Sequence, residues 1–319
     1  MLLPEERDQN LEADMMFETP GVTCLCPTYG RLERLRDAVA CFLLQDYPNR
    51  WLLILNDAPV PISFRPPLAG VAVVNAAPRY ETLGHKRQAL LWAAQTPLAA
   101  HWDDDDLYLP WHLSHCAAAL SGDTGGPRAK ADQTSDKGPQ PLAPSLPQMV
   151  KPRGAWWAVG PGAQFHVKGP CHNNFEGQLV FDCEAARELG GYPPTVSGQA
   201  LALMSKFQKA EIFHRFDPFP FVSYVYRWGD GVWHISGGGD NERNHASFAR
   251  RSTDFGDGEP LIPKGHDPLE WAAARLEPLF DRLLEGVHQC ISTDVYPLFE
   301  TRLKHYFKVA PARPGEGCP

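Results

Sequence analysis

The sequence predicts an α/β protein built on a mostly parallel central sheet flanked by helices. Apolar segments of strand length alternate with segments whose apolar residues recur at helical spacing, which is typical of a doubly wound sheet. Residues 51–56 are apolar almost throughout, as expected of a strand that is covered on both faces. Polar residues follow three of the predicted strands, at the end where such sheets bind ligands.

The first hundred residues supply most of the predicted sheet. Strands are predicted at 21–28, 51–56, 71–74 and 98–102. Between them lie two helices, at 31–45 and 84–94, of which the first carries a clear apolar stripe. This order predicts that Thr28, Asp57 and the residues after Trp102 meet at one edge of the sheet.

The second half of the sequence is less regular. Further strands are predicted within 156–183 and at 219–228, short helices at 184–189 and 201–209, a glycine-rich loop at 229–247, and amphipathic helices from residue 267 onward. The polar residues 121–154 are interpreted as a flexible insertion. The predicted organisation is therefore an N-terminal extension (1–20), one main domain (21–250) and a helical C-terminal region (251–319).

The composition is that of an ordinary globular protein. Of the 319 residues, 43% are hydrophobic and 21% are charged, and the net charge of −8 argues against broad binding to nucleic acid. No apolar run reaches the roughly 18 to 20 residues that span a bilayer, and Met1 to Glu18 lack an apolar secretory segment. The eight cysteines are scattered without a CxxC pair, which predicts buried free thiols and a reducing, cytoplasmic location.

Four consecutive aspartates, Asp103–Asp106, follow the strand predicted to end at Trp102. Adjacent carboxylates repel one another, and a divalent cation such as Mg²⁺ or Mn²⁺, which takes oxygen ligands, relieves that repulsion. A phosphate-bearing substrate can complete the ligand shell of such a cation. The alternative is a solvated acidic turn in which one carboxylate caps the next helix.

Four blocks in the first 115 residues form a series with a characteristic order and spacing. They are Pro27-Thr28-Tyr29-Gly30-Arg31 with Gln45-Asp46-Tyr47-Pro48, the strand that ends at Asp57, Gly84-His85-Lys86-Arg87-Gln88, and Asp103–Asp106 with Pro110. This series resembles family 2 glycosyltransferases of the GT-A fold, whose third block usually carries Ala-Arg-Asn. The resemblance is strong over 21–115 and weaker over 175–237, and it does not extend beyond about residue 250.

The resemblance implies a UDP-linked sugar donor and a divalent metal, Mn²⁺ or Mg²⁺. It implies that Asp105 is the direct metal ligand and a catalytic residue, and that Asp103 contacts the ribose or the metal shell. His234, in the glycine-rich loop, completes the metal site unless it is a structural histidine. The residues implied around the nucleotide are Pro27, Thr28, Tyr29, Arg31, Asp57, Arg87, Asp103 and Asp104, with Asp57 at the base or ribose and Arg87 beside the base.

Several of these residues also have purely structural interpretations. Arg87 can be a surface arginine of its helix, and Tyr29 and Arg31 can be ordinary capping residues at a strand end. Asp104 can be merely solvated. Asp106 is interpreted as a secondary helper at the metal.

The sequence departs from the family pattern where the acceptor must lose its proton. Inverting members use an acid, usually an aspartate, after the segment that here reads Gly190-Gly191-Tyr192. Ala200 stands at the position of this expected general base, and alanine accepts no proton. Three explanations stay open: an Asp→Ala substitution in this sequence, a base supplied elsewhere by Glu176 or Asp182, or a protein that no longer transfers sugar.

The sequence thus predicts a metal-dependent, inverting glycosyltransferase that moves a sugar from a UDP-sugar to an acceptor hydroxyl. The alternative that Ala200 raises is a nucleotide-sugar-binding protein without catalysis. A third interpretation is transfer to a modified base in DNA, which is suggested by Arg243, Arg250, Arg251 and the basic residues of 121–154 but opposed by the acidic net charge. The acceptor otherwise stays open between glycan, small molecule, protein and DNA, and the oligomeric state is not predicted.

Overall fold

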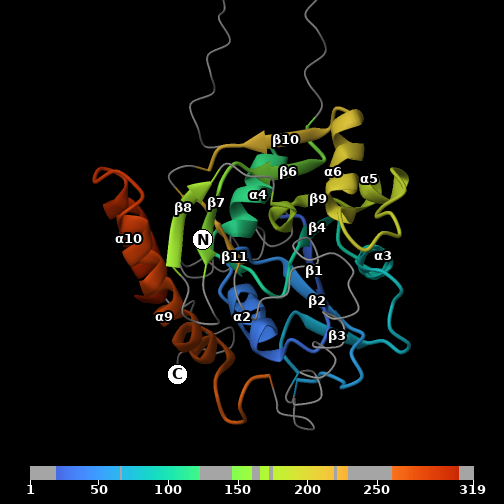
Figure 1. Ribbon diagram of the computed structural model, residues 1–319, viewed down its shortest axis with the longest axis horizontal. Helices are drawn as coiled ribbons and strands as arrows, with labels where there is room; N and C mark the ends of the chain where they lie inside the picture. Colours follow the sequence, from blue (N-terminus) through green and yellow to red (C-terminus); the bar gives the residue numbers. More distant parts are fainter. Residues whose placement is uncertain are drawn as a thin grey trace, which may run out of the picture.

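A seven-stranded sheet lies at the centre of the computed structural model, which describes residues 19–64, 67–122, 146–159, 166–171, 175–218, 221–228 and 261–308. Its strands are β1 (Val22–Thr28), β2 (Arg50–Asn56), β3 (Val71–Asn75), β4 (Leu98–His101), β6 (Met149–Pro152), β9 (Val180–Asp182) and β10 (Phe213–Phe216). They are ordered β10-β6-β9-β4-β1-β2-β3 (Figure 1). Neighbouring strands are parallel except where β9 pairs with β4 and β6. The predicted α/β class with a mostly parallel sheet is confirmed.

A smaller four-stranded sheet lies beside the first. Its order is β5 (Leu107–Tyr108), β11 (Tyr224–Trp228), β7 (Ala155–Val159) and β8 (His166–Cys171). The helices are α2 (Leu32–Leu43), α3 (Leu83–Ala93), α4 (His112–Leu120), α5 (Cys183–Glu188), α6 (Gln199–Lys209), α9 (Pro268–His288) and α10 (Tyr296–Lys308), with a 3₁₀ turn, η1 (Glu176–Gln178).

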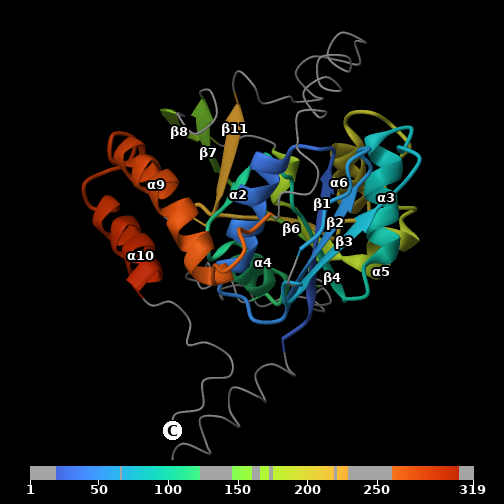
Figure 2. The same cartoon turned by 90° about the horizontal axis from the view of Figure 1, so that it is seen from below.

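Helices cover both faces of the larger sheet. α3, α5 and α6 lie on one face, and α2 and α4 lie on the other (Figure 2). The predicted apolar stripe of α2, which includes Leu35, Val39 and Phe42, is buried against the sheet. α9 packs on α2 and β8, and α10 packs on α9. The helices at the C-terminal end of the described chain are therefore part of the same packed structure.

Local signals explain where the helices begin. α9 starts after Asp267, whose Oδ1 accepts hydrogen bonds from the backbone N–H of Leu269 and Glu270, and Pro268 is its first residue. α3 starts after Thr82, whose hydroxyl accepts a hydrogen bond from the backbone N–H of His85. Each cap satisfies backbone donors that the first helical turn leaves unpaired.

Some elements differ from the sequence-based expectation. Residues 149–152, at the end of the expected flexible insertion, form β6 inside the larger sheet, and 123–145 lie outside the described residues. β5, α4 and β10 were not predicted. In the described part of the chain, no helix is both long and apolar enough to cross a membrane. Six cysteines there are free thiols, and all of these except Cys290 are buried.

Candidate functional site

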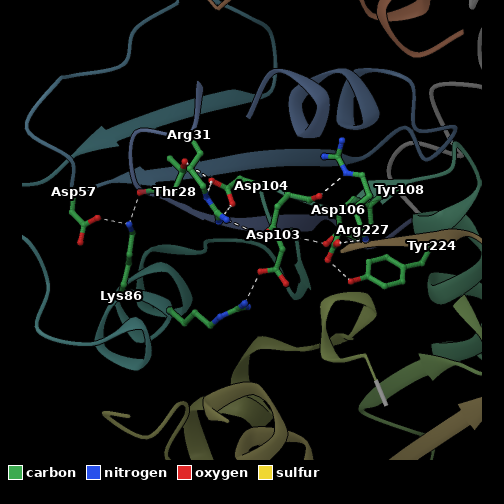
Figure 3. Close-up of polar contacts among 12 residues, drawn as sticks. Thr28, Arg31, Asp57, Lys86, Asp103, Asp104, Asp106, Tyr108, Tyr224 and Arg227 are labelled. Atoms are coloured by element: carbon green, nitrogen blue, oxygen red, sulfur yellow. Dashed lines mark hydrogen bonds and ion pairs between the residues drawn. The ribbon is translucent and has the colours of Figure 1, made fainter. Parts of the chain in front are cut away.

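Polar residues gather where β1, β2 and β4 end. Thr28, the last residue of β1, is paired with Asn56, the last residue of β2. His101, the last residue of β4, is paired with Leu25, so β4 ends before β1 does. The chain after β4 therefore carries the aspartates past the end of β1. There the Thr28 hydroxyl donates to Asp104 Oδ2 at 2.6 Å (Figure 3). We call this edge, with Thr28, Asp57 and Asp103–Asp106, the acidic edge.

Asp104 is firmly held at the acidic edge. Asp104 is only 1% exposed, so the alternative that its side chain is merely solvated is wrong. Besides the bond from Thr28, it accepts hydrogen bonds from Arg31 through Nε, at 3.2 Å, and through Nη2. Burial raises the pKa of Asp104, and the charge of Arg31 opposes that shift.

Two arginines pair with the carboxylates of the run. Arg31 Nη1 donates to Asp105 Oδ2 at 2.8 Å, so one guanidinium bridges Asp104 and Asp105. Arg87 donates through Nη2 to Asp103. Arg87 is 5% exposed and so is not a surface arginine, and its buried Nε and Nη1 have no hydrogen-bond partner among the described residues. The structure thus brings both predicted arginines to the aspartates.

Asp106 anchors the run to the second sheet. It is buried and accepts hydrogen bonds from the Tyr224 hydroxyl and, at 3.0 Å, from the backbone N–H of Arg227. Burial first, and then the neighbouring carboxylates, raise the pKa of Asp106 well above its usual value. Arg227 Nε also donates to the backbone carbonyl of Asp105 at 2.6 Å. These contacts fix the backbone of the run.

Lys86 is a residue of the acidic edge that the sequence reasoning missed. Its ammonium donates to Asp57 Oδ1 and to the Thr28 carbonyl (Figure 3). The backbone N–H of Tyr80 donates to Asp57 Oδ2 at 3.0 Å. The side chains of Lys86 and Asp57 are 6% and 3% exposed. The sequence does mark Lys86 as unusual, because it stands where the family that the sequence resembles usually carries alanine.

The remaining predicted site residues are Pro27 and Tyr29 on the nucleotide side and His234 as a metal ligand. Pro27 is in β1, paired with Leu55 of β2. The ring of Tyr29 packs against Arg79, whose Cζ is 4.2 Å from the ring centroid. His234 lies outside the described residues.

The chemistry of the acidic edge fits a hard divalent cation. Asp103 and Asp105 offer carboxylate oxygens, and Mg²⁺ is commonly bound by one or two carboxylates together with substrate phosphates. Within the described ranges, no group of three or more His, Cys, Asp or Glu side chains is arranged to hold a metal ion. A metal bound here would therefore need ligands beyond these side chains, such as the oxygens of a diphosphate.

Ala200, the position predicted for the general base, lies at the start of α6. Ala200 is buried in the first turn of α6, which packs against η1. Asp182 cannot replace it from its place in the fold, because antiparallel pairing sets Asp182 beside Leu98, at the opposite end of β4 from the aspartates. There Asp182 caps α5 by accepting a hydrogen bond from the backbone N–H of Ala185 at 2.8 Å.

Glu176 lies near the acidic edge instead. Its carbonyl oxygen is 2.7 Å from Nδ1 of His101, at the end of β4. A Cβ atom on the next residue, Gly177, would lie 3.1 Å from Asp103 Oδ2, so η1 closely adjoins the run. Burial is the main cause that raises the pKa of the Glu176 carboxyl.

Comparisons with known proteins bear on the fold. No protein-family model and no curated protein sequence matches the chain. Among solved structures, the chain is similar to residues 1–349 of S. aureus TarS in complex with UDP-GlcNAc, with a TM-score of 0.50 and 12% identity over 91% of this chain and 82% of that one. It is also similar to the mannosyltransferase PcManGT from Pyrobaculum calidifontis in complex with GDP-Man and Mn²⁺, with a TM-score of 0.46 and 17% identity over 94% and 91%. The similarity to TarS shows a shared fold, in agreement with the fold class that the sequence predicts.

Proposed function

We propose that the protein is a glycosyltransferase that moves a sugar from a UDP-sugar to an acceptor hydroxyl, with inversion and with the help of Mn²⁺ or Mg²⁺. The observation that carries the proposal is the acidic edge, where three neighbouring strand ends bring Thr28, Asp57 and Asp103–Asp106 together. This is the end at which open parallel sheets bind ligands. The fold shared with TarS, which was solved with UDP-GlcNAc, supports the choice of donor.

In this proposal the nucleoside lies toward Asp57 and the diphosphate toward Asp103 and Asp105. These two aspartates would hold the metal, with His234 as a candidate further ligand, and the metal would neutralise the charge that grows on the leaving diphosphate. Arg31 and Arg87 add fixed positive charge beside the same group. Tyr29 and Pro27 complete the surface on the nucleotide side.

We assign the general base to Glu176. The acceptor hydroxyl must lose a proton as it attacks, and Ala200 cannot take it. Glu176 adjoins the run through η1, and burial raises its pKa, which makes a carboxylate a better base. Asp182 is left out because it lies at the far end of β4. An Asp→Ala substitution at position 200 remains the competing explanation.

Ala200 also favours a second candidate function, a nucleotide-sugar-binding protein without catalysis. Transfer to DNA gains no support, because Arg243, Arg250 and Arg251 lie outside the described residues. A cytoplasmic location remains part of the proposal and agrees with the free thiols of the described cysteines.

The test combines binding and turnover. Calorimetry with UDP is expected to show binding that strengthens with Mn²⁺, and a coupled assay is expected to show release of UDP from a UDP-sugar. Binding without release of UDP would favour the non-catalytic alternative, and no binding of any nucleotide would overturn both.

Three variants then test the assignment of the base. Glu176→Gln is expected to slow transfer at least tenfold while leaving UDP affinity unchanged, and Asp182→Asn, which keeps the helix cap, is the matched control. A large gain of rate in Ala200→Asp would instead show that the base is missing from this sequence.

A further inference from the structure

His101 is a polar residue inside an apolar layer of the core. It is the last residue of β4 and is fully buried, with its ring stacked on Tyr192 and in edge contact with Phe181. An imidazole in such a place needs hydrogen-bond partners for its ring nitrogens. Its Nδ1 lies 2.7 Å from the Glu176 carbonyl oxygen, and its Nε2 contacts the Tyr192 hydroxyl. His101 therefore ties η1 to the end of β4.

The partners of His101 determine where its hydrogen lies. The Glu176 carbonyl can only accept, so Nδ1 carries a hydrogen and donates to it. Burial first, and then the charge of Arg87, lower the pKa of His101 well below its usual value, so the ring is neutral. Nε2 then has no hydrogen and accepts the hydrogen bond that the Tyr192 hydroxyl donates. The hydrogen bonds thus run in one direction, from Tyr192 through His101 to the backbone of η1.

A second contact holds the next carbonyl of η1. The Tyr108 hydroxyl donates to the Gly177 carbonyl at 3.0 Å and accepts from the backbone N–H of Asp103 at 2.8 Å. η1 is therefore fixed both to β4 and to the aspartate run. Its first residue, Glu176, is partly exposed, and the charges of Asp103 and Arg87 both affect the pKa of its carboxyl, which places that carboxyl near the acidic edge.

We propose that His101 is a positioning residue for the general base: by holding the Glu176 carbonyl, it fixes η1 so that the Glu176 carboxylate faces the acceptor hydroxyl. The inference rests on the proposed function and deepens it by naming a residue that supports the base. In the transfer step the acceptor oxygen bonds to the anomeric carbon of the sugar, and its proton passes to Glu176. The bond between sugar and diphosphate breaks, and its electron pair leaves with UDP. A displaced base slows this step even when both substrates bind normally.

The first experiment measures release of UDP in the presence of Mn²⁺, with water as the acceptor. The donor is whichever of UDP-glucose, UDP-galactose and UDP-GlcNAc the unaltered protein cleaves fastest. His101→Leu is expected to lower kcat by about tenfold or more, while the KM for the donor and the affinity for UDP, measured by calorimetry, change less than about twofold. The matched control is Arg187→Met, which removes another donor to backbone carbonyls, those of Leu91 and Ala94, and is expected to leave kcat unchanged.

Two comparisons separate positioning of the base from a general loss of structure. Asparagine can donate from Nδ2, which lies near the place of the histidine Nδ1, so His101→Asn is expected to retain kcat within about threefold. In the Glu176→Gln background, His101→Leu is expected to lower kcat less than about twofold further, because both changes act on one group. A variant His101→Asn as slow as His101→Leu, or a further loss of about tenfold in that background, would overturn the inference.

Tyr192→Phe keeps the test decisive if His101→Leu does not fold. It removes the donor to Nε2 while the aromatic ring that stacks on His101 stays. It is expected to lower kcat about threefold when Glu176 is present and to have no effect in the Glu176→Gln background. An unchanged kcat in Tyr192→Phe then overturns the inference.

The remaining outcomes separate this inference from the function on which it rests. If Glu176→Gln slows release of UDP but His101→Leu does not, the inference fails and the proposed function stands. If Glu176→Gln releases UDP at the full rate, the assignment of the base fails and the inference fails with it, whereas sugar transfer still stands. If the unaltered protein cleaves none of the three donors, the catalytic proposal and the inference both fail.

Discussion

Among the residues that the structure describes, buried ion pairs at two places in the fold have different surroundings and therefore different roles. At the acidic edge the pairs stand at strand ends, where a ligand can exchange with them. At a second place, which we call the helix junction, Asp37 of α2 accepts hydrogen bonds from Arg227 Nη1 and Arg275 Nε, both at 2.7 Å. These pairs lie between packed elements, α2, β11 and α9. Carboxylate–arginine pairs are therefore available for ligand binding at the acidic edge, whereas at the helix junction they hold packed elements together.

Arg227 connects the two regions. Its Nη1 binds Asp37 at the helix junction, while its backbone N–H and Nε hold Asp106 and the carbonyl of Asp105 at the acidic edge. The junction thus supports the backbone of the aspartate run. We therefore expect substitutions at the helix junction to change mainly the free energy of unfolding, and substitutions at the acidic edge to change mainly the activity.

The largest expected effect is at Asp37. Asp37→Ala leaves the buried Arg227 without its carboxylate and is expected to lower the free energy of unfolding by about 3–5 kcal/mol, because an uncompensated buried charge is strongly unfavourable. Urea unfolding measures the change. Glu33→Ala, which removes an exposed partner of Arg275, is the control and is expected to lose less than about 1 kcal/mol. A loss below about 1 kcal/mol in Asp37→Ala would remove the contrast between the regions.

The corresponding change at the acidic edge is Asp105→Asn. It is expected to reduce kcat/KM for the donor by about 10²–10³-fold, because it weakens the electrostatic stabilisation of the leaving group. Steady-state kinetics with Mn²⁺ checks this, beside Asp281→Asn, an exposed aspartate on α9, as the control. Full metal-dependent transfer by Asp105→Asn would contradict the assignment.

Acid is expected to destabilise the protein through two histidines of α4, the buried His112 and the partly buried His115. Burial lowers the pKa of His112 to about 3 and that of His115 to about 4. An unfolded histidine has a pKa of about 6.5, so below that pH the unfolded chain binds more protons and stability falls, by about 2 kcal/mol per histidine at pH 5. Urea unfolding at pH 7.5 and pH 5 measures the loss. His112→Asn is expected to reduce it, and the exposed His305→Gln is not; equal pH dependence in both variants would contradict the assignment to His112.

The smallest expected effect is at Arg275. Its side chain is partly exposed, and Arg227 still pairs with Asp37 when it is removed, so Arg275→Met is expected to lower the free energy of unfolding by about 1 kcal/mol or less. In the double variant with Asp37→Ala, the total is expected to fall short of the sum, because both changes remove one interaction. Full additivity would show that α9 is held without this pair.

The sequence predicts the first half of the fold well because its signals are local. Apolar runs mark β1, β2 and β4, and the residues after them reach the same edge by the geometry of a parallel sheet. β6 was not predicted because Met149–Pro152 is a short strand that contains a lysine and a proline. Such a segment has the composition of a loop, and only its neighbours in the sheet make it a strand.

Contacts between residues far apart in the sequence also limit what can be predicted about the site. A lysine within a helix ordinarily points to solvent. The lysine in place of the family's usual alanine marks Lys86 as unusual, but it does not identify Asp57, 29 residues away, as its partner. The sequence also leaves Glu176 and Asp182 both open as the general base, because it does not show in which direction the strand between them runs. Asp182 follows a strand and Glu176 precedes it, but β9 runs antiparallel, so the acid before the strand is the one near the acidic edge.

The bridge that Arg31 makes across Asp104 and Asp105 has a consequence for every cation that enters the site. A guanidinium tethered to the end of β1 is present at a high effective concentration, so it acts as an intramolecular competitor for these oxygens. If a metal binds as proposed, its affinity would depend on the difference in free energy between the carboxylates paired with the cation and the carboxylates paired with Arg31. It would not follow from the number of aspartates alone. A protein with four adjacent carboxylates can in this way be selective about when it accepts a metal.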